Sequence, residues 1–372
     1  MTAPAPEVRA TGRAWVAALT VLLAFAVGLW AGRRTVEARA RRPFEELSAE
    51  VTLGRALADP ARKQGAAMAY LDPAAALREM DSYAWSVPND PAPFVGSVPT
   101  PGVHGNARID AHGFRSDYEV ERAKAPRTRR FFFTGGSNAF GVGAPSRART
   151  VGGYLEAELG GESELVIAAN PAWASTHERI LIENRLGAMS PDVVIALSGN
   201  NDVHWGWSGE DSGWMLTYAD ALFADAIARA RGTPAPARVE RAPVASALVA
   251  ARLAKNARLS ALALAPGGAI YVLALQPSMH ASRKRLSPRE RELARGQSSA
   301  RRDYFVACYE ELRRLGPELA AAGARFVDLS RAFDDLGEES EIFIDPYHTG
   351  DRGNRIVALA LAAALRETGV LR

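Results

Sequence analysis

The sequence predicts an α/β protein whose parallel sheet is covered by helices on both faces. Two observations lead to this fold class. Five short segments are apolar almost without interruption, as strands buried on both faces are, and each is separated from the next by sequence with helical spacing of apolar residues. At 372 residues with 48% hydrophobic content, the chain is also long enough to bury one large core.

The chain starts with a segment of a different kind, residues 14–32 (AWVAALTVLLAFAVGLWAG), which carries no charge. Its length suffices to cross a bilayer core of about 30 Å as a helix, and Trp15 and Trp30 stand where interfacial aromatic residues usually lie. We therefore expect a tail over residues 1–13 and a retained single-pass membrane anchor over residues 14–32. Two arginines precede this segment and five follow it closely, and this balance alone would keep the larger part of the chain on the cytoplasmic side.

Residues 33–109 are expected to form a juxtamembrane and linker region. Within them, residues 87–102 (VPNDPAPFVGSVPTPG) contain five prolines and indicate an extended linker or surface loop. A second proline-containing break, residues 232–243, is interpreted as an excursion within the domain. The globular domain itself is expected to span residues 110–372.

The five strands follow in order, with helical sequence between them. They are expected at residues 130–134 (RFFFT), 164–170 (ELVIAAN), 192–198 (DVVIALS), 269–275 (AIYVLAL) and 324–329 (ARFVDL). Ser175 and Glu178 form a capping pair that should open the helix after the second strand. Because the carboxyl ends of parallel strands meet at one edge of a sheet, polar residues that follow the strands should share a crevice.

The turn after the first predicted strand, in FFFTGGSNAFGVGA (residues 131–144), has two functional interpretations. A phosphate cradle would need GxGxxG or a Gly-Lys-Ser/Thr sequence, and neither is present. A nucleophile is the better interpretation, since Ser137 stands at the mouth of the sheet. A serine needs a base held by a third group, and His348 with Asp345 three residues earlier supplies such a pair. The N–H groups of Ser137 and Ala172 and the side-chain amide of Asn201 are candidate oxyanion donors.

The order of these motifs resembles the SGNH, or GDSL-like, hydrolase family. The serine block is GGSNAFG (residues 135–141), a later block is GNND (residues 199–202) and the last is DPYH (residues 345–348). HGFRS (residues 112–116) is similar to a segment that precedes the serine block in membrane-anchored bacterial members. The resemblance covers roughly residues 110–370. It implies a flavodoxin-like three-layer sandwich with a five-stranded parallel sheet.

The resemblance also implies roles for individual residues. Ser137 would be the nucleophile, His348 the general base and then acid, Asp345 its orienting carboxylate and Asn201 an oxyanion donor. Two residues depart from the family pattern. The serine follows Gly-Gly instead of Gly-Asp, and Ala172 stands at a glycine position, where it would be unfavourable if the backbone required positive φ.

The function expected from these residues is that of a membrane-anchored serine esterase that removes a small acyl group, such as acetyl from a carbohydrate. An acyltransferase that passes the acyl group to a sugar hydroxyl, and a binding protein that keeps the fold without catalysis, remain alternatives. Sugar-ester chemistry on an anchored enzyme favours an extracytoplasmic domain. Three tryptophans near the expected crevice could stack on sugar rings or form the core of a lid: Trp173, Trp205 and Trp207.

Other partners are not expected. The net charge of +3 is mild and the arginines are scattered, which disfavours nucleic acid as a partner. No histidine pair has the spacing of metal ligands, and the predicted chemistry uses no metal and no cofactor. Cys308, the single cysteine, lies in an amphipathic pattern with Phe305 and Leu312 and is expected in the core.

Overall fold

Five parallel strands form the central sheet of the computed structural model, which describes residues 19–20, 22–34, 57–210, 228, 231–234 and 241–371. The strands are β5 (Arg129–Gly135), β6 (Ser163–Ile167), β7 (Val193–Ser198), β8 (Ile270–Leu275) and β9 (Arg325–Asp328). They pair in the order β6-β5-β7-β8-β9, and each neighbouring pair is parallel. The predicted strands and the parallel sheet are confirmed. With the second strand outside the first, this is the flavodoxin-like order.

The alternation of side chains along each strand divides the core into two layers. In β5, Phe132 packs on one face of the sheet, whereas Phe131 and Phe133 pack on the other, and all three are fully buried. Because both faces are buried, the strands read as continuous apolar runs in the sequence.

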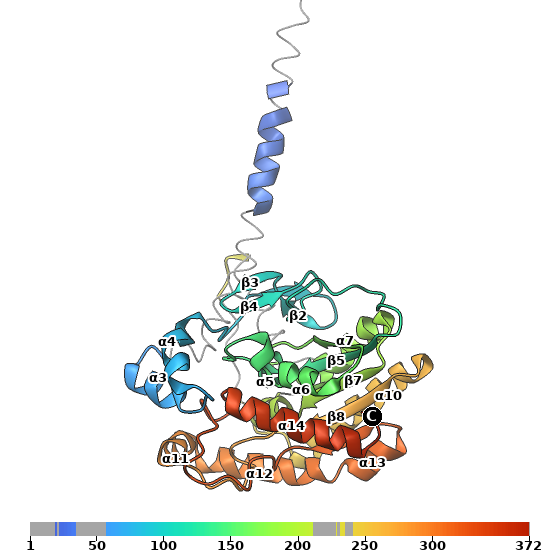
Figure 1. Cartoon of the computed structure of the whole chain (residues 1–372). Coiled ribbons are helices and arrows are strands. Elements are labelled where there is room, and N and C mark those ends of the chain that lie inside the picture. Colours follow the sequence, from blue (N-terminus) through green and yellow to red (C-terminus); the bar gives the residue numbers. More distant parts are fainter. Residues whose placement is uncertain are drawn as a thin grey trace, which may run out of the picture.

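Helices cover both faces of the sheet, as expected for a three-layer sandwich. One face is covered by α6 (Val151–Leu159) and α14 (Asp351–Glu367), which lie side by side (Figure 1). The opposite face is covered by four helices: α7 (Ser175–Asn184), α10 (Ser246–Leu264), α12 (Ser299–Arg313) and α13 (Gly316–Ala321). Cys308 of α12 is fully buried in this second layer, so its predicted place in the core is confirmed.

The region upstream of residue 110 differs from the linker that we expect from its prolines. From residue 57 onward it contains folded elements: α3 (Pro60–Ala67), α4 (Pro73–Glu79), the hairpin β1 (Asn89–Ala92) with β2 (Gly96–Pro99), and the hairpin β3 (Gly102–His104) with β4 (Ala107–Ile109). Pro60 and Pro73 occupy the first positions of their helices, where a missing N–H costs nothing, and Asp59 and Asp72 cap them. The five prolines of residues 87–102, from which the linker is expected, lie in or next to the two hairpins.

The upstream elements pack against the main domain. Tyr70, Met80 and Tyr83 form a small buried cluster together with Ile344, which immediately precedes Asp345. The Tyr70 hydroxyl donates a hydrogen bond of 2.7 Å to the Gly143 carbonyl. The folded unit thus begins well before the expected boundary at residue 110.

The predicted membrane anchor falls partly outside the described residues. Residues 19–20 and 22–34 are helical, and the apolar side chains of Leu22, Leu23 and Phe25 are about two-thirds exposed, at 66%, 66% and 65%. Among the described residues, no helix has both the length and the apolar character needed to cross a bilayer. The anchor remains a prediction.

Candidate active site

Ser137 is placed by a turn that only glycine can make. β5 ends at Gly135, whose φ is +146°, and a Cβ there would come within 2.4 Å of the Leu197 carbonyl oxygen. A Cβ on Gly136 would come within 2.2 Å of the Asn201 amide nitrogen. Ser137 then begins the short helix α5 (Ser137–Phe140), where its side chain is partly exposed.

The structure brings the three predicted triad residues together. His348 Nε2 lies 2.8 Å from Ser137 Oγ, and His348 Nδ1 lies 2.8 Å from Asp345 Oδ2. The other carboxylate oxygen, Asp345 Oδ1, accepts hydrogen bonds of 2.7 Å from the backbone N–H groups of Tyr347 and His348. Since the carboxylate engages Nδ1–H, Nε2 is the nitrogen free to accept a proton from the serine.

Burial and neighbouring groups act in opposite directions on the pKa of His348 and on that of Asp345. Burial opposes charge on His348, but the Asp345 carboxylate outweighs it, and the pKa of the imidazole is raised above its ordinary value. Burial likewise opposes ionisation of Asp345, whereas His348 and the two backbone N–H groups favour it. The net effect lowers the pKa of this carboxyl. Asp345 therefore stays ionised and can stabilise an imidazolium on His348.

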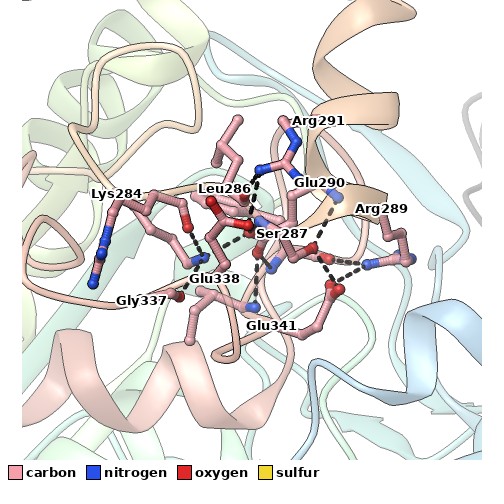
Figure 2. A network of polar contacts seen from close by, with 12 residues as sticks. Lys284, Leu286, Ser287, Arg289, Glu290, Arg291, Gly337, Glu338 and Glu341 are labelled. Atoms are coloured by element: carbon pink, nitrogen blue, oxygen red, sulfur yellow. Dashed lines mark hydrogen bonds and ion pairs between the residues drawn. The ribbon is translucent and has the colours of Figure 1, made fainter.

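Figure 2 shows a polar network around Lys284, Arg289 and Glu290. This network fixes the segment that leads into Asp345. Its centre is an ion pair between Lys284 Nζ and Glu290 Oε2 at 2.6 Å, with both side chains completely buried. Glu290 Oε1 accepts hydrogen bonds of 2.9 and 3.2 Å from the backbone N–H groups of Ile342 and Phe343. Arg289 donates to the carbonyls of Phe343 and Ile344, each at 2.7 Å. All these contacts come from α11 (Pro288–Arg295) or the loop before it.

A second support holds the far end of α5. Arg115, in the HGFRS segment, is 1% exposed, and its Nη1 donates to the carbonyls of Phe140 and Gly141 at 3.0 and 2.7 Å. A cation at these carbonyls satisfies acceptors that a helix end leaves unpaired. Asn138 in the same turn donates to the Tyr347 carbonyl at 2.8 Å, which joins the serine turn to the histidine loop.

The predicted oxyanion donors also lie at this end of the sheet. Asn201, in the first turn of α8 (Asn200–Trp207), donates one amide hydrogen to the Trp173 carbonyl at 2.7 Å. Its amide has a second hydrogen, and the same nitrogen packs against Gly136, next to Ser137. Ala172 has a φ of +69°, the left-handed conformation in which an alanine is unfavourable. The Trp205 indole N–H holds the Ala172 carbonyl at 3.1 Å.

The three tryptophans differ in position. Trp173 is only 4% exposed, its N–H donates to the Ser97 carbonyl at 3.2 Å, and its ring stacks on His177. It is therefore a core side chain and does not form an exposed surface for substrate, which is one of its two expected roles. Trp205 is partly exposed and holds the Ala172 loop. Trp207 is also partly exposed and packs on Tyr304 of α12, with 5.6 Å between ring centroids.

The expected capping pair Ser175 and Glu178 makes other contacts. Ser175 Oγ donates to Asp202 Oδ1 at 2.5 Å, and Glu178 accepts from Ser198 Oγ at 2.8 Å. The capping contact comes from His177 instead, whose Nδ1 accepts the Ala174 N–H at 3.1 Å. Burial raises the pKa of Asp202 to about 6 and that of Glu178 well above its ordinary value. This buried network ties the helix that follows the Ala172 turn to the residue after Asn201.

Several supporting residues are given no role at the site by the sequence: Lys284, Arg289, Glu290, Arg115 and Asp202, whereas Glu178 is expected only as a helix cap. Arg115 lies in HGFRS and Asp202 in GNND, two segments that resemble family motifs, so a role for both residues could be predicted from the sequence. Arg289 had no local signal, because its partners lie about fifty residues away in the chain. Lys284 and Glu290 are only six residues apart, and Glu290 forms a capping box with Ser287 at the start of α11, which is the local signal that could have found it.

No protein-family model and no curated protein matches the chain. Solved structures with a similar fold include an acetyl-xylooligosaccharide esterase from Geobacillus (17% identity, TM-score 0.41, covering 65% of this chain and 94% of that one). They also include a putative arylesterase from Agrobacterium tumefaciens (16%, 0.40, 64% and 99%) and a putative GDSL-like lipase from Parabacteroides merdae (14%, 0.41, 65% and 95%). The esterase and lipase activities in these names are those of the similar proteins.

Proposed function

We propose that the protein is a serine ester hydrolase that removes a small acyl group, and that Ser137, His348 and Asp345 form its catalytic triad. One observation carries the proposal: an unbroken chain of two 2.8 Å contacts joins Ser137 Oγ, the two ring nitrogens of His348 and Asp345 Oδ2. A serine hydroxyl in contact with a base, itself oriented by a buried carboxylate, is the arrangement that activates oxygen for attack on a carbonyl.

The reaction follows from this geometry. His348 Nε2 takes the hydroxyl proton as Ser137 Oγ forms a bond to the acyl carbon, and the carbonyl oxygen becomes an oxyanion. Asn201 and the backbone N–H groups of Ser137 and Ala172 are the donors proposed to stabilise that charge. The oxyanion collapses and the alcohol leaves with the proton from His348, which leaves the acyl group on Ser137 Oγ. Water then attacks this acyl group while His348 takes its proton, and the acid is released as His348 returns the proton to Ser137 Oγ.

The proposal is tested by the rate of hydrolysis of p-nitrophenyl acetate. Ser137→Ala and His348→Ala should each lower kcat by at least about 10³-fold, since neither variant can form the activated alkoxide. Ser146→Ala, a change of the same kind in the loop after the nucleophile turn, is the matched control and should keep most of the activity. Retention of most activity in either triad variant would remove the assignment.

We also propose that residues 14–32 anchor the protein in a membrane with the hydrolase domain outside the cytoplasm. The uncharged 19-residue segment and its two terminal tryptophans support the anchor. A reporter fused after Arg372 that is active only when exported tests the orientation. A signal from a cytoplasm-specific reporter would instead agree with the arginines that follow the segment.

A further inference from the structure

Arg301 carries a positive charge at the same edge of the sheet as the triad. It lies in the first turn of α12, the long helix that follows β8, and it reaches toward the loop of His348. Its guanidinium carbon lies 5.6 Å from the centroid of the Tyr347 ring and 5.7 Å from that of the Phe305 ring. Its Nη2 lies 2.8 Å from His204 Nδ1. Because a guanidinium can only donate, His204 Nδ1 accepts this hydrogen bond and carries no proton.

Arg301 has no negatively charged neighbour in the described part of the chain, and the two histidines near it are neutral. Burial, and then the neighbouring guanidinium, lowers the pKa of His204 to about 4, and the same two causes with Arg302 lower that of His280 to about 4. Both histidines are therefore neutral near pH 7. Within the part of the chain that the structure describes, no carboxylate lies within ion-pair distance of Arg301. Other buried or half-buried arginines pair with an acid or with backbone carbonyls, among them Arg115, Arg130, Arg147 and Arg289.

Arg301 also keeps unused hydrogen-bonding capacity. Its Nε is buried and has no hydrogen-bond partner in the described part of the chain, although the residue as a whole is partly exposed. Guanidinium groups present several donors in a plane that matches a carboxylate. An unpaired, partly desolvated cation is costly to maintain unless a ligand compensates it.

Two residues connect Arg301 to the reaction centre. Tyr347, whose ring faces the guanidinium, precedes His348 in the chain, and its carbonyl is held by Asn138, next to Ser137. His204 lies three residues after Asn201 in α8, so both occupy the same face of that helix. Gln297 Oε1 accepts a hydrogen bond of 3.1 Å from the Tyr347 hydroxyl, on the same side of the site. A group bound at Arg301 would thus lie beside a substrate whose ester is at Ser137.

We propose that Arg301, with Tyr347 and His204 around it, forms a subsite for a carboxylate on the alcohol part of the ester substrate, so that the preferred substrate is an acylated acidic sugar. The inference rests on the proposed function for the position of the ester, but the binding of a carboxylate at Arg301 can be measured without catalysis.

The kinetic test compares two acetylated sugars that differ in one charge, a 3-O-acetyl methyl glucuronoside and its neutral glucuronamide counterpart. Acetate release gives kcat/KM for each. The native protein should prefer the acid by roughly ten- to a hundredfold, the range of a charge-assisted hydrogen bond. Arg301→Gln should remove this preference, and Arg301→Lys should keep part of it. Arg314→Gln, which removes an exposed arginine at the other end of α12, is the control and should keep the preference.

Binding gives a second readout that does not depend on hydrolysis. Titration calorimetry with the Ser137→Ala protein should show tighter binding of methyl glucuronoside than of methyl glucuronamide, and Arg301→Gln in that background should equalise the two. Equal binding of both sugars by the Arg301-containing protein, or a preference that survives Arg301→Gln, would overturn the subsite. If the proteins bind in the expected way but the native chain releases acetate from neither sugar and does not hydrolyse p-nitrophenyl acetate, the proposed function fails and the carboxylate subsite stands.

Discussion

Ala172 holds a backbone conformation that its side chain opposes. Its φ of +69° lies in the left-handed region, where a Cβ costs about 1–2 kcal/mol relative to a right-handed residue. The Trp205 indole and the Asn201 amide bond the carbonyls of Ala172 and Trp173, so the fold enforces the turn from both sides. The turn is thus maintained in spite of the alanine.

Ala172→Gly should therefore stabilise the protein. Glycine removes the steric penalty but adds freedom to the unfolded chain, and the expected net gain in the free energy of unfolding is up to about 1 kcal/mol. Denaturant titration measures it. Ser190→Gly, which makes the same change at a left-handed position with φ of +52° outside the site, is the control for the general effect. A loss of stability in Ala172→Gly alone would contradict this account of the turn.

In the proposed mechanism, His348 determines the pH dependence of the reaction. The neutral ring accepts the serine proton, so kcat/KM should rise with pH through the pKa of His348, which Asp345 raises above the ordinary value in spite of burial. In Asp345→Asn, burial acts without the carboxylate, so this limb of the profile should move to lower pH and kcat should fall by about 10⁴-fold. The pH profile of p-nitrophenyl acetate hydrolysis measures both. Asp303→Asn, the same change at an exposed position, is the control and should leave the limb in place. A limb that also stays in place in Asp345→Asn would be inconsistent with the proposed role.

Among the elements, α11 has the clearest effect on the site. Through Glu290 and Arg289 it binds the backbone of residues 342–344, just before Asp345. Because both Lys284 and Glu290 have no exposed side-chain surface, the removal of one leaves the other as an uncompensated buried charge. The ion pair therefore matters for the position of the loop more than for net stability.

A double-mutant cycle tests this pair. Lys284→Met should lower the free energy of unfolding by about 3–5 kcal/mol, and Glu290→Gln by a similar amount. The double variant should lose less than the sum, because glutamine keeps a carbonyl oxygen for the N–H groups of Ile342 and Phe343 while both charges are gone. Additive losses in denaturant titrations would show that the two charges do not interact.

At the scale of the whole molecule, residues 57–109 belong to the folded unit. They supply most of the cluster that buries Ile344, and Trp85 packs so closely on Gly143 that a Cβ there would lie 2.4 Å from its ring. The loop of His348 and the turn after Ser137 thus both rest on upstream sequence.

A chain that begins at residue 110 should be much less stable than one that begins at residue 57. The shorter chain exposes Ile344 and loses the Tyr70 contact to Gly143, and the loss of several large buried apolar contacts should cost more than about 3 kcal/mol. Thermal unfolding of the two chains, followed by circular dichroism, makes the comparison. Equal melting temperatures would mean that the upstream segment is dispensable.

The sequence predicted what local pattern and chain order can encode. Buried strands appear as apolar runs. Ser137 and Asn201 directly follow predicted strands, and Asp345 and His348 lie after the last one, so the sequence predicts that these residues lie close together. Contacts between distant segments leave no such pattern. The fold of residues 57–109, the contacts of Glu290 with Ile342 and Phe343, and the place of Trp173 in the core depend on tertiary packing. Prolines are ambiguous as well, since Pro60 and Pro73 begin helices whereas Pro91 and Pro99 lie in the strands of a hairpin.

Fluorophosphonate labelling followed by peptide mapping tests the central claim, activated Ser137, most directly. The probe reacts with a serine only when a base makes its oxygen nucleophilic, so the account predicts one stoichiometric adduct on Ser137 that is absent from His348→Ala. An unlabelled Ser137 in the folded native protein, or an adduct that persists without His348, would contradict it.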